Sequence, residues 1–129
     1  MVRVAINGFG RIGRRVFRLL LEHPGIEVVA INDIADVKTL AHLTKYDSIH
    51  GTLKKKVSSD NVHIIIDNIK IPVLSEAHPK NINWKPFNVD VIIESSGKFK
   101  KKSELVHHVN NGASKVILTV PPTDDAIKT

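Results

Sequence analysis

The chain has 129 residues, enough for one domain of ordinary size with its own hydrophobic core. Its residues are 42% hydrophobic and 25% charged, as in a soluble globular protein, and no stretch is long and apolar enough to cross a bilayer. The net charge is +6 and cysteine is absent, which excludes thiolate zinc sites, disulfides and cysteine nucleophiles within this chain. A strand pattern that starts at about Arg3 leaves no room for a signal peptide, so we expect a cytoplasmic protein with no membrane partner.

Two runs of lysine, at 54–56 and 100–102, would attract a polyanion such as RNA. Solvated surface lysines are the simpler interpretation, because aromatic residues make up only 5% of the chain and do not alternate with the basic residues. We therefore expect no nucleic-acid partner, with an RNA-binding or nucleotide-binding module kept as an alternative.

A glycine-rich turn joins the first two predicted elements. A short apolar strand ending at Asn7 leads into the pattern G-x-G-x-x-G, made by Gly8, Gly10 and Gly13, and a helix pattern follows. In such a turn the first glycine permits the bend, the second lets a pyrophosphate approach the backbone, and the third lets helix and strand pack closely. Asp33 stands 20 residues after Gly13, at the end of the second predicted strand, where a ribose-binding carboxylate is expected. This order of features predicts a dinucleotide site.

The helix after the turn is amphipathic and ends at Pro24 and Gly25. Residues 27–32 are almost continuously apolar, as in a strand buried on both faces of a parallel sheet. Crossover connections are right-handed, so this strand is expected to lie parallel to the first and to bring Asp33 beside the turn. Four helix residues spaced for one face are predicted to contact the sheet: Ile12, Val16, Leu19 and Leu20.

The middle of the chain departs from the strand and helix alternation. A second helix is predicted at 36–45, and three segments of alternating polarity follow, with Asp67 and Asn68 placed as a tight hairpin turn. This pattern predicts an antiparallel meander inserted into the α/β order. The three alternating segments are residues 52–58, 62–66 and 69–74.

Residues 79–86 are expected to form a loop or short helix in which Trp84 is a packing anchor. A buried strand is predicted at 90–94, and it ends in a turn of small residues at 95–99. Open α/β sheets bind ligands at the carboxyl ends of their strands, so this turn is expected to belong to a ligand site.

The last helix is predicted to start between Lys100 and Ser103 and to end at Asn111, with Gly112 as its stop. Three lysines at its start oppose the helix dipole, so either the helix begins at Ser103 as its cap or the lysines have another role. Its inward residues are predicted to be Leu105, Val106 and Val109.

The neighbouring His107 and His108 are expected to point in different directions, so they cannot serve one metal, and complementing the helix dipole is the simpler account of both. A strand is predicted at 115–120 and ends at Pro121 and Pro122. The tail at 123–129 carries solvated acids at Asp124 and Asp125 and no further element.

Five segments of the chain carry specific motifs: N-G-F-G-R-I-G-R from Asn7, A-I-N-D ending at Asp33, Y-D-S-I-H-G at 46–51, E-S-S-G at 94–97 and T-V-P at 119–121. Together they resemble the amino-terminal half of glyceraldehyde-3-phosphate dehydrogenase, and the resemblance covers the chain from end to end. It implies an α/β fold: a Rossmann-type doubly wound parallel sheet with an inserted antiparallel meander, forming an incomplete dinucleotide-binding domain at 1–129.

The resemblance also implies roles in cofactor binding. The backbone from Gly8 to Ile12 would hold the pyrophosphate, with Arg11 and Ile12 closest to it. Asp33 would accept from the adenosine ribose and repel a 2′-phosphate, which favours NAD over NADP. Asn32 would face the same ribose, the turn after the 90–94 strand would line the adenine pocket, and Thr119 would stand on the nicotinamide side, where the family usually has serine. The implied cofactor-binding residues are Asn7, Gly8, Gly10, Arg11, Ile12, Asn32, Asp33, Ser96, Gly97, Phe99 and Thr119.

Two positions are weaker. The family often has a basic residue near the adenine end, where this chain has Ala77 after Glu76, so Glu76 and Ala77 are weak assignments. His50 belongs to a loop motif and is interpreted as a structural hydrogen-bonding residue rather than as a catalytic base.

The family oxidises glyceraldehyde 3-phosphate through a thioester on a cysteine activated by a histidine, and phosphate then releases 1,3-bisphosphoglycerate. The resemblance places both groups in a catalytic domain absent from this chain, so we expect it to hold NAD and to be inactive alone. It implies the missing carboxyl-terminal half as partner and a homotetramer for the complete glycolytic enzyme. Truncation, proteolysis and a split enzyme are the alternative explanations for the absence of the catalytic half. An erythrose-4-phosphate dehydrogenase fragment is an alternative identity, because that enzyme shares the opening motif. Without its partner half the chain is expected to be marginally stable.

Overall fold

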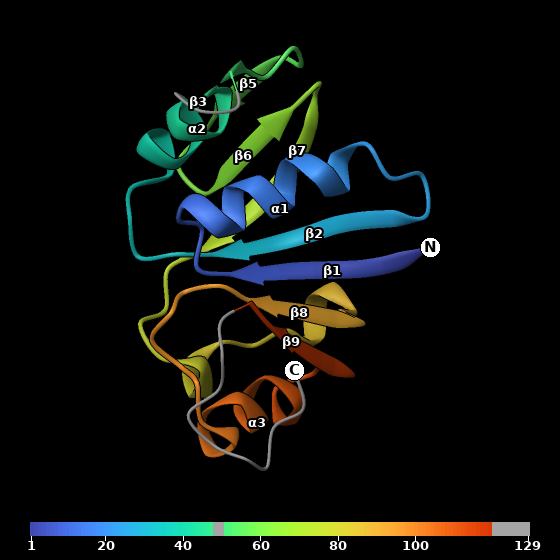
Figure 1. Ribbon diagram of the computed structural model, residues 1–129, viewed down its shortest axis with the longest axis vertical. Coiled ribbons are helices and arrows are strands. Elements are labelled where there is room, and N and C mark those ends of the chain that lie inside the picture. The colour runs from blue at the N-terminus through green and yellow to red at the C-terminus, as the bar shows by residue number, and fades with distance from the viewer. Residues whose placement is uncertain (48–50, 120–129) are drawn as a thin grey trace.

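A seven-stranded sheet runs through the centre of the computed structural model, which describes residues 1–47 and 51–119 (Figure 1). In chain order its strands are β1 (Val2–Asn7), β2 (Ile26–Asn32), β5 (Val57–Ser59), β6 (His63–Ile66), β7 (Ile69–Leu74), β8 (Val91–Glu94) and β9 (Lys115–Leu118). In space their order is β5-β6-β7-β2-β1-β8-β9. The five strands from β7 to β9 are parallel, whereas β5, β6 and β7 pair antiparallel. The doubly wound sheet is therefore confirmed, and the meander extends it at one edge.

Helices cover the two faces of this sheet. The helices are α1 (Arg11–Leu21), α2 (Val37–Lys45), α3 (Lys102–Asn110) and the short 3₁₀ turns η1 (Pro79–Asn81) and η2 (Lys85–Phe87). The helix α1 packs on β1 and β2, α2 on β5 and β6, and α3 on β9 and η1 (Figure 1). Successive residues of β1 enter different cores: Val4 and Ile6 pack with Phe17 of α1, while Ala5 packs with Trp84 on the opposite face. Trp84 is fully buried, as expected for a packing anchor.

The face that α1 turns toward the sheet agrees with the prediction at Val16 and Leu20, which pack against the core, and differs from it at Ile12 and Leu19. Gly13 and Phe17 are buried, whereas Ile12 and Leu19 are 47% and 62% exposed. The reason is the glycine turn: a Cβ on Gly13 would lie 2.3 Å from the carbonyl oxygen of Gly8, so Gly13 must face the turn. That contact fixes the rotation of the helix and moves Ile12 and Leu19 toward solvent.

The inward face of α3 agrees with the prediction at Leu105 and differs from it at Val106 and Val109. Leu105 and His108 are buried, but Val106 and Val109 are 39% and 45% exposed. His108 is not a dipole-complementing surface residue, because its ring is fully buried and bonded on both nitrogens. The helix starts after Lys101, whose N–H donates to the Glu104 carboxylate at 3.3 Å, so Ser103 is not the cap.

The meander differs from the prediction at its first segment. Residues 52–58 do not form one strand: a short strand pair of β3 (Tyr46–Asp47) and β4 (Gly51–Thr52) ends at Thr52, and β5 begins at Val57. The hairpin between β6 and β7 is confirmed, with φ of 47° at Asp67 and 72° at Asn68.

Some predictions fall outside the described residues: His50 with the loop around it, the end of the last strand at Val120, Pro121 and Pro122, and the tail with Asp124 and Asp125. Within residues 1–47 and 51–119, every helix is too short or too polar to span a membrane.

Candidate functional site

A cavity of about 160 Å³ opens at the carboxyl edge of the parallel strands. It lies among the segments that follow β1, β2, β7 and β8, so four neighbouring strands deliver side chains to one place. Its lining residues are Asn7, Gly8, Gly10, Asn32, Asp33, Ile34, Glu76, Ala77, Ser95, Ser96, Lys98 and Phe99.

Two of the three turn glycines are required by contacts inside the protein. Gly8 has φ of +90°, and a Cβ there would lie 2.4 Å from the backbone N and Cα of Ser96. Gly13 is pressed against the Gly8 carbonyl, which also accepts a hydrogen bond of 2.6 Å from the Ser95 hydroxyl. A Cβ on Gly10, by contrast, would meet no atom within 4 Å. Packing therefore explains Gly8 and Gly13, while Gly10 leaves open space beside the cavity.

The amino-terminal end of α1 is suited to an anion. Gly10 occupies the N-cap position, and among the described residues no side chain caps the helix and no acidic residue lies in its first turn. The first backbone N–H groups of a helix have no partner within the helix and carry the positive end of its dipole. A pyrophosphate placed beside Gly10 would supply the missing acceptors. The uncapped end, the open space at Gly10 and the glycine turn together fit a dinucleotide.

Asp33 lies beside the glycine turn, as the sequence predicts. Its Oδ2 accepts from the Phe9 N–H at 2.7 Å and its Oδ1 accepts from the Ala35 N–H at 2.9 Å. Each carboxylate oxygen can accept more than one hydrogen bond, so acceptor capacity remains for ribose hydroxyls. Asp33 thus holds the turn and lines the cavity with its carboxylate.

Asn7 and Asn32 are 3% and 2% exposed and bond mainly to the protein. The Asn32 amide donates to Asn7 Oδ1 at 2.7 Å and to the Glu76 carbonyl at 2.9 Å, and its own oxygen accepts from the Glu76 N–H. Asn7 Nδ2 donates to Glu94 Oε1 at 2.7 Å. Both side chains therefore form the floor beneath the cavity and join neighbouring strands.

The structure brings most of the predicted residues together and leaves four outside the lining. Arg11 and Ile12 are exposed in the first turn of α1 next to Gly10, and Gly97 follows Ser96 with φ of +73°. Thr119 follows β9, where its hydroxyl donates to the Glu94 carbonyl at 3.2 Å. The seven predicted residues that line the cavity are Asn7, Gly8, Gly10, Asn32, Asp33, Ser96 and Phe99.

Five lining residues are absent from the predicted set: Ile34, Ser95 and Lys98, together with Glu76 and Ala77, which the sequence left as weak assignments. Ile34, Ser95 and Lys98 are each the immediate neighbour of a predicted residue, and that adjacency was the available signal. The ring of Phe99 packs against the ring of His78, with the two centroids 5.1 Å apart.

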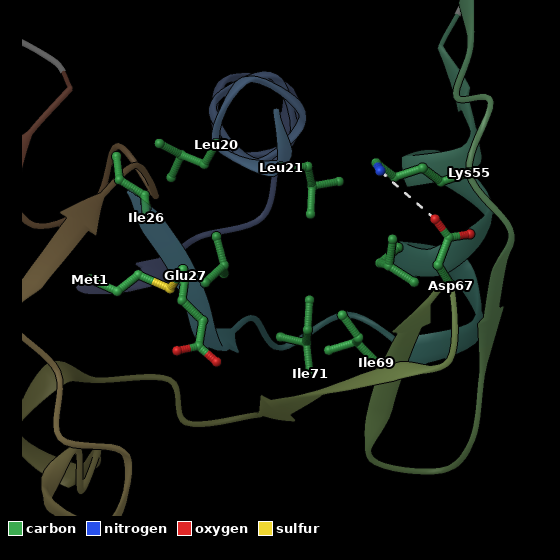
Figure 2. Close-up of a pocket in the computed structure, with 11 residues that line it drawn as sticks. Met1, Leu20, Leu21, Ile26, Glu27, Lys55, Asp67, Ile69 and Ile71 are labelled. Atoms are coloured by element: carbon green, nitrogen blue, oxygen red, sulfur yellow. Dashed lines mark ion pairs between the residues drawn. The ribbon is translucent and has the colours of Figure 1, made fainter. Parts of the chain in front are cut away.

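A second cavity, of about 310 Å³, lies at the opposite, amino-terminal edge of the same strands (Figure 2). Leu20, Leu21, Ile26 and Ile71 point into it, and the Lys55 to Asp67 ion pair of 3.8 Å stands at its rim (Figure 2). It holds no convergent set of polar groups, so the smaller cavity at the glycine turn is the better candidate site.

The parallel sheet, the glycine turn leading into an uncapped helix, and the carboxylate at the end of β2 define a dinucleotide-binding domain of the Rossmann type. Nothing in the described part of the chain gathers three or more histidine and carboxylate side chains in a metal-binding cluster.

Comparison with known proteins narrows this class. The family model for the NAD-binding domain of glyceraldehyde 3-phosphate dehydrogenase matches residues 2–102. The chain is 46% identical over 98% of its length to glyceraldehyde-3-phosphate dehydrogenase 1 of Bacillus cereus, and 51% identical over 99% to the enzyme of Borreliella burgdorferi. The chain belongs to the glyceraldehyde 3-phosphate dehydrogenase family and matches the NAD-binding domain of that family. It spans 38% and 39% of the length of these two relatives.

Proposed function

We propose that this chain is the NAD-binding portion of a phosphorylating glyceraldehyde-3-phosphate dehydrogenase. The complete enzyme would convert glyceraldehyde 3-phosphate, phosphate and NAD to 1,3-bisphosphoglycerate and NADH, in glycolysis and in the cytoplasm. The observation that carries the proposal is the open space at Gly10, beside an uncapped helix end, in a chain of this family. NAD, when bound, accepts the hydride.

The residues of this chain would bind and orient that cofactor. The N–H groups after Gly10, with Arg11 and Ile12, would hold the pyrophosphate. Asp33 would accept hydrogen bonds from the adenosine ribose. Asn32, in the floor of the cavity, would face the same ribose. Thr119, beyond β9, would stand on the nicotinamide side. The adenine pocket would be lined by Ser96, Gly97 and Phe99.

The thiolate chemistry of the proposed reaction would come from outside this chain, which contains no cysteine. We propose a separate carboxyl-terminal catalytic part as its partner and a homotetramer as the complete assembly. The relatives are more than twice as long as this chain, which supports a further part.

A standalone module for RNA would use the lysine runs at 54–56 and 100–102, but no residue of either run lines the cavity at the glycine turn. The one lysine among the lining residues is Lys98, which lies outside both runs. An erythrose-4-phosphate dehydrogenase fragment would use the same NAD site, so it differs from the leading proposal only in the catalytic part.

Calorimetric titration of the chain with NAD, NADP and a short RNA tests the proposal. We expect NAD to bind more tightly than NADP, and RNA to bind only weakly and with a steep dependence on salt. Asp33→Asn keeps an oxygen for the Phe9 N–H but removes the charge, so NAD affinity should fall about tenfold while NADP affinity does not fall. Asp36→Asn is the matched control, because it makes the same charge change outside the cavity and keeps a good helix cap.

Tighter binding of NADP than of NAD by the parent chain would contradict the role given to Asp33. Salt-dependent binding of RNA with no response to NAD would favour the standalone module instead.

A further inference from the structure

A continuous line of buried polar side chains runs beneath the cavity at the glycine turn. Trp84 Nε1 donates to His108 Nδ1 at 3.0 Å, and His108 Nε2 lies 2.9 Å from Glu94 Oε1. Glu94 accepts from Asn7, and Asn7 accepts from Asn32. We call these five residues the polar chain. Trp84 precedes η2, His108 is on α3, and the other three residues are at the ends of β8, β1 and β2, so the polar chain joins neighbouring strand ends to α3.

The direction of each hydrogen bond in the polar chain can be assigned. An indole N–H only donates, so His108 Nδ1 must be the acceptor and carry no proton. The ring proton is therefore on Nε2, which donates to Glu94 Oε1. Glu94 Oε1 also accepts from Asn7 Nδ2, while Oε2 accepts from the N–H and the hydroxyl of Ser96 at 3.1 and 2.7 Å. The buried carboxylate is surrounded by four donors.

Stability alone is a poor explanation of this arrangement. Glu94 and His108 are both 0% exposed, and a buried carboxylate has a large desolvation cost that well-packed apolar residues would avoid. Departures from the rule that charged side chains stay at the surface occur mainly at functional sites. The two groups that Glu94 holds in place, Ser96 and Asn7, both line the cavity, whereas Glu94, His108 and Trp84 do not.

We propose that His108 and Glu94 are positioning residues for the cofactor site, acting through Ser96 and Asn7. The proposal rests on the proposed function of NAD binding. His108 orients the carboxylate, the carboxylate fixes Ser96 against Gly8, and the cavity keeps the shape that the cofactor requires. Binding at the cavity should also be felt at Trp84, the far end of the polar chain and the sole tryptophan of the sequence.

The test compares three variants of α3 in the 129-residue chain, each checked for cooperative urea unfolding. His108→Leu removes the donor to Glu94, and we expect NAD to bind about tenfold more weakly by calorimetry. His108→Gln can place an amide N–H near Nε2, so its affinity should return to within about threefold of the parent. Leu105→Ala is the matched control, because it removes buried volume from the same helix and leaves every hydrogen bond of the polar chain in place. Its NAD affinity should equal that of the parent.

A spectroscopic readout on the parent chain makes the test independent of variant folding. When Trp84 is excited, its fluorescence emission should change as NAD is added, and the resulting titration curve should match the binding curve from calorimetry. Equal NAD affinity in His108→Leu and Leu105→Ala would overturn the proposal, and so would an emission that stays constant while NAD binds. Failure of the parent chain to bind NAD at all would instead contradict the proposed function.

Discussion

The glycine-turn edge and the meander are two regions of one sheet, and they bury different kinds of side chain. The meander places Ile64, Ile66 and Ile71 in the core, and its charged groups, such as Asp60, remain near the surface. The glycine-turn edge buries Asn32 and Glu94, with each polar atom bonded. This difference indicates that the meander contributes mainly to stability, whereas the buried polar groups of the glycine-turn edge shape the cavity.

The largest expected effect is at the turn. Gly8→Ala would place a Cβ 2.4 Å from the Ser96 backbone at a φ of +90°, so it should cost about 4 kcal/mol in the free energy of unfolding and abolish NAD binding. Urea denaturation and calorimetry measure the two effects. Gly25→Ala, whose nearest neighbour is a His23 ring atom at 3.4 Å, should change either quantity little. Wild-type stability in Gly8→Ala would show that the turn does not need this close approach.

A substitution in the meander should separate stability from binding. Ile64 is fully buried in the core shared with β1 and α1, so Ile64→Ala should cost about 3 kcal/mol in the free energy of unfolding. The NAD affinity of the molecules that remain folded should not change, because Ile64 is far along the sheet from the glycine turn and outside its cavity. Calorimetry at a temperature where the variant is folded checks this. A tenfold weaker affinity would break the division between the two regions.

Sequence patterns were sufficient to predict the features that depend on residues close together in the chain. The strands, the glycine turn and the position of Asp33 follow from local residue spacing and from the handedness of the crossover. The rotation of α1 did not, because it is fixed by the contact of Gly13 with the Gly8 carbonyl.

The inward face of α3 was missed for a similar reason. Hydrophobic periodicity selects Val106 and Val109 beside Leu105, but His108 is the second buried residue of α3, because Trp84 and Glu94 supply its hydrogen-bond partners from distant segments. A pattern of one helix cannot show such partners. Likewise, the carboxylate of Asp33 was predicted as a ribose acceptor, and its bond to the Phe9 N–H became visible only in the fold.

The smallest expected effect lies at the exposed end of the meander. Hydrogen bonding by the Val62 N–H, and then by His63, lowers the pKa of Asp60 from 3.8 to about 2. A lowered pKa in the folded state stabilises the fold above the unfolded value, and this contribution is lost as the pH falls from about 4 to about 2. Asp60→Asn should therefore unfold at a slightly lower urea concentration than the parent at about pH 5, with the difference shrinking as the pH falls. A difference that grows on acidification would contradict the assignment, and NAD affinity should not change.

The central claim is that the open space at Gly10 exists for a cofactor, and Gly10→Ala tests it most directly. An added Cβ would meet no protein atom within 4 Å, and the φ of −80° suits alanine. The variant should therefore unfold within about 1 kcal/mol of the parent, with only the small cost of alanine at an N-cap. Its NAD affinity, measured by calorimetry, should fall at least about tenfold because the methyl group occupies the place of the pyrophosphate. Unchanged stability together with unchanged NAD affinity would contradict the account.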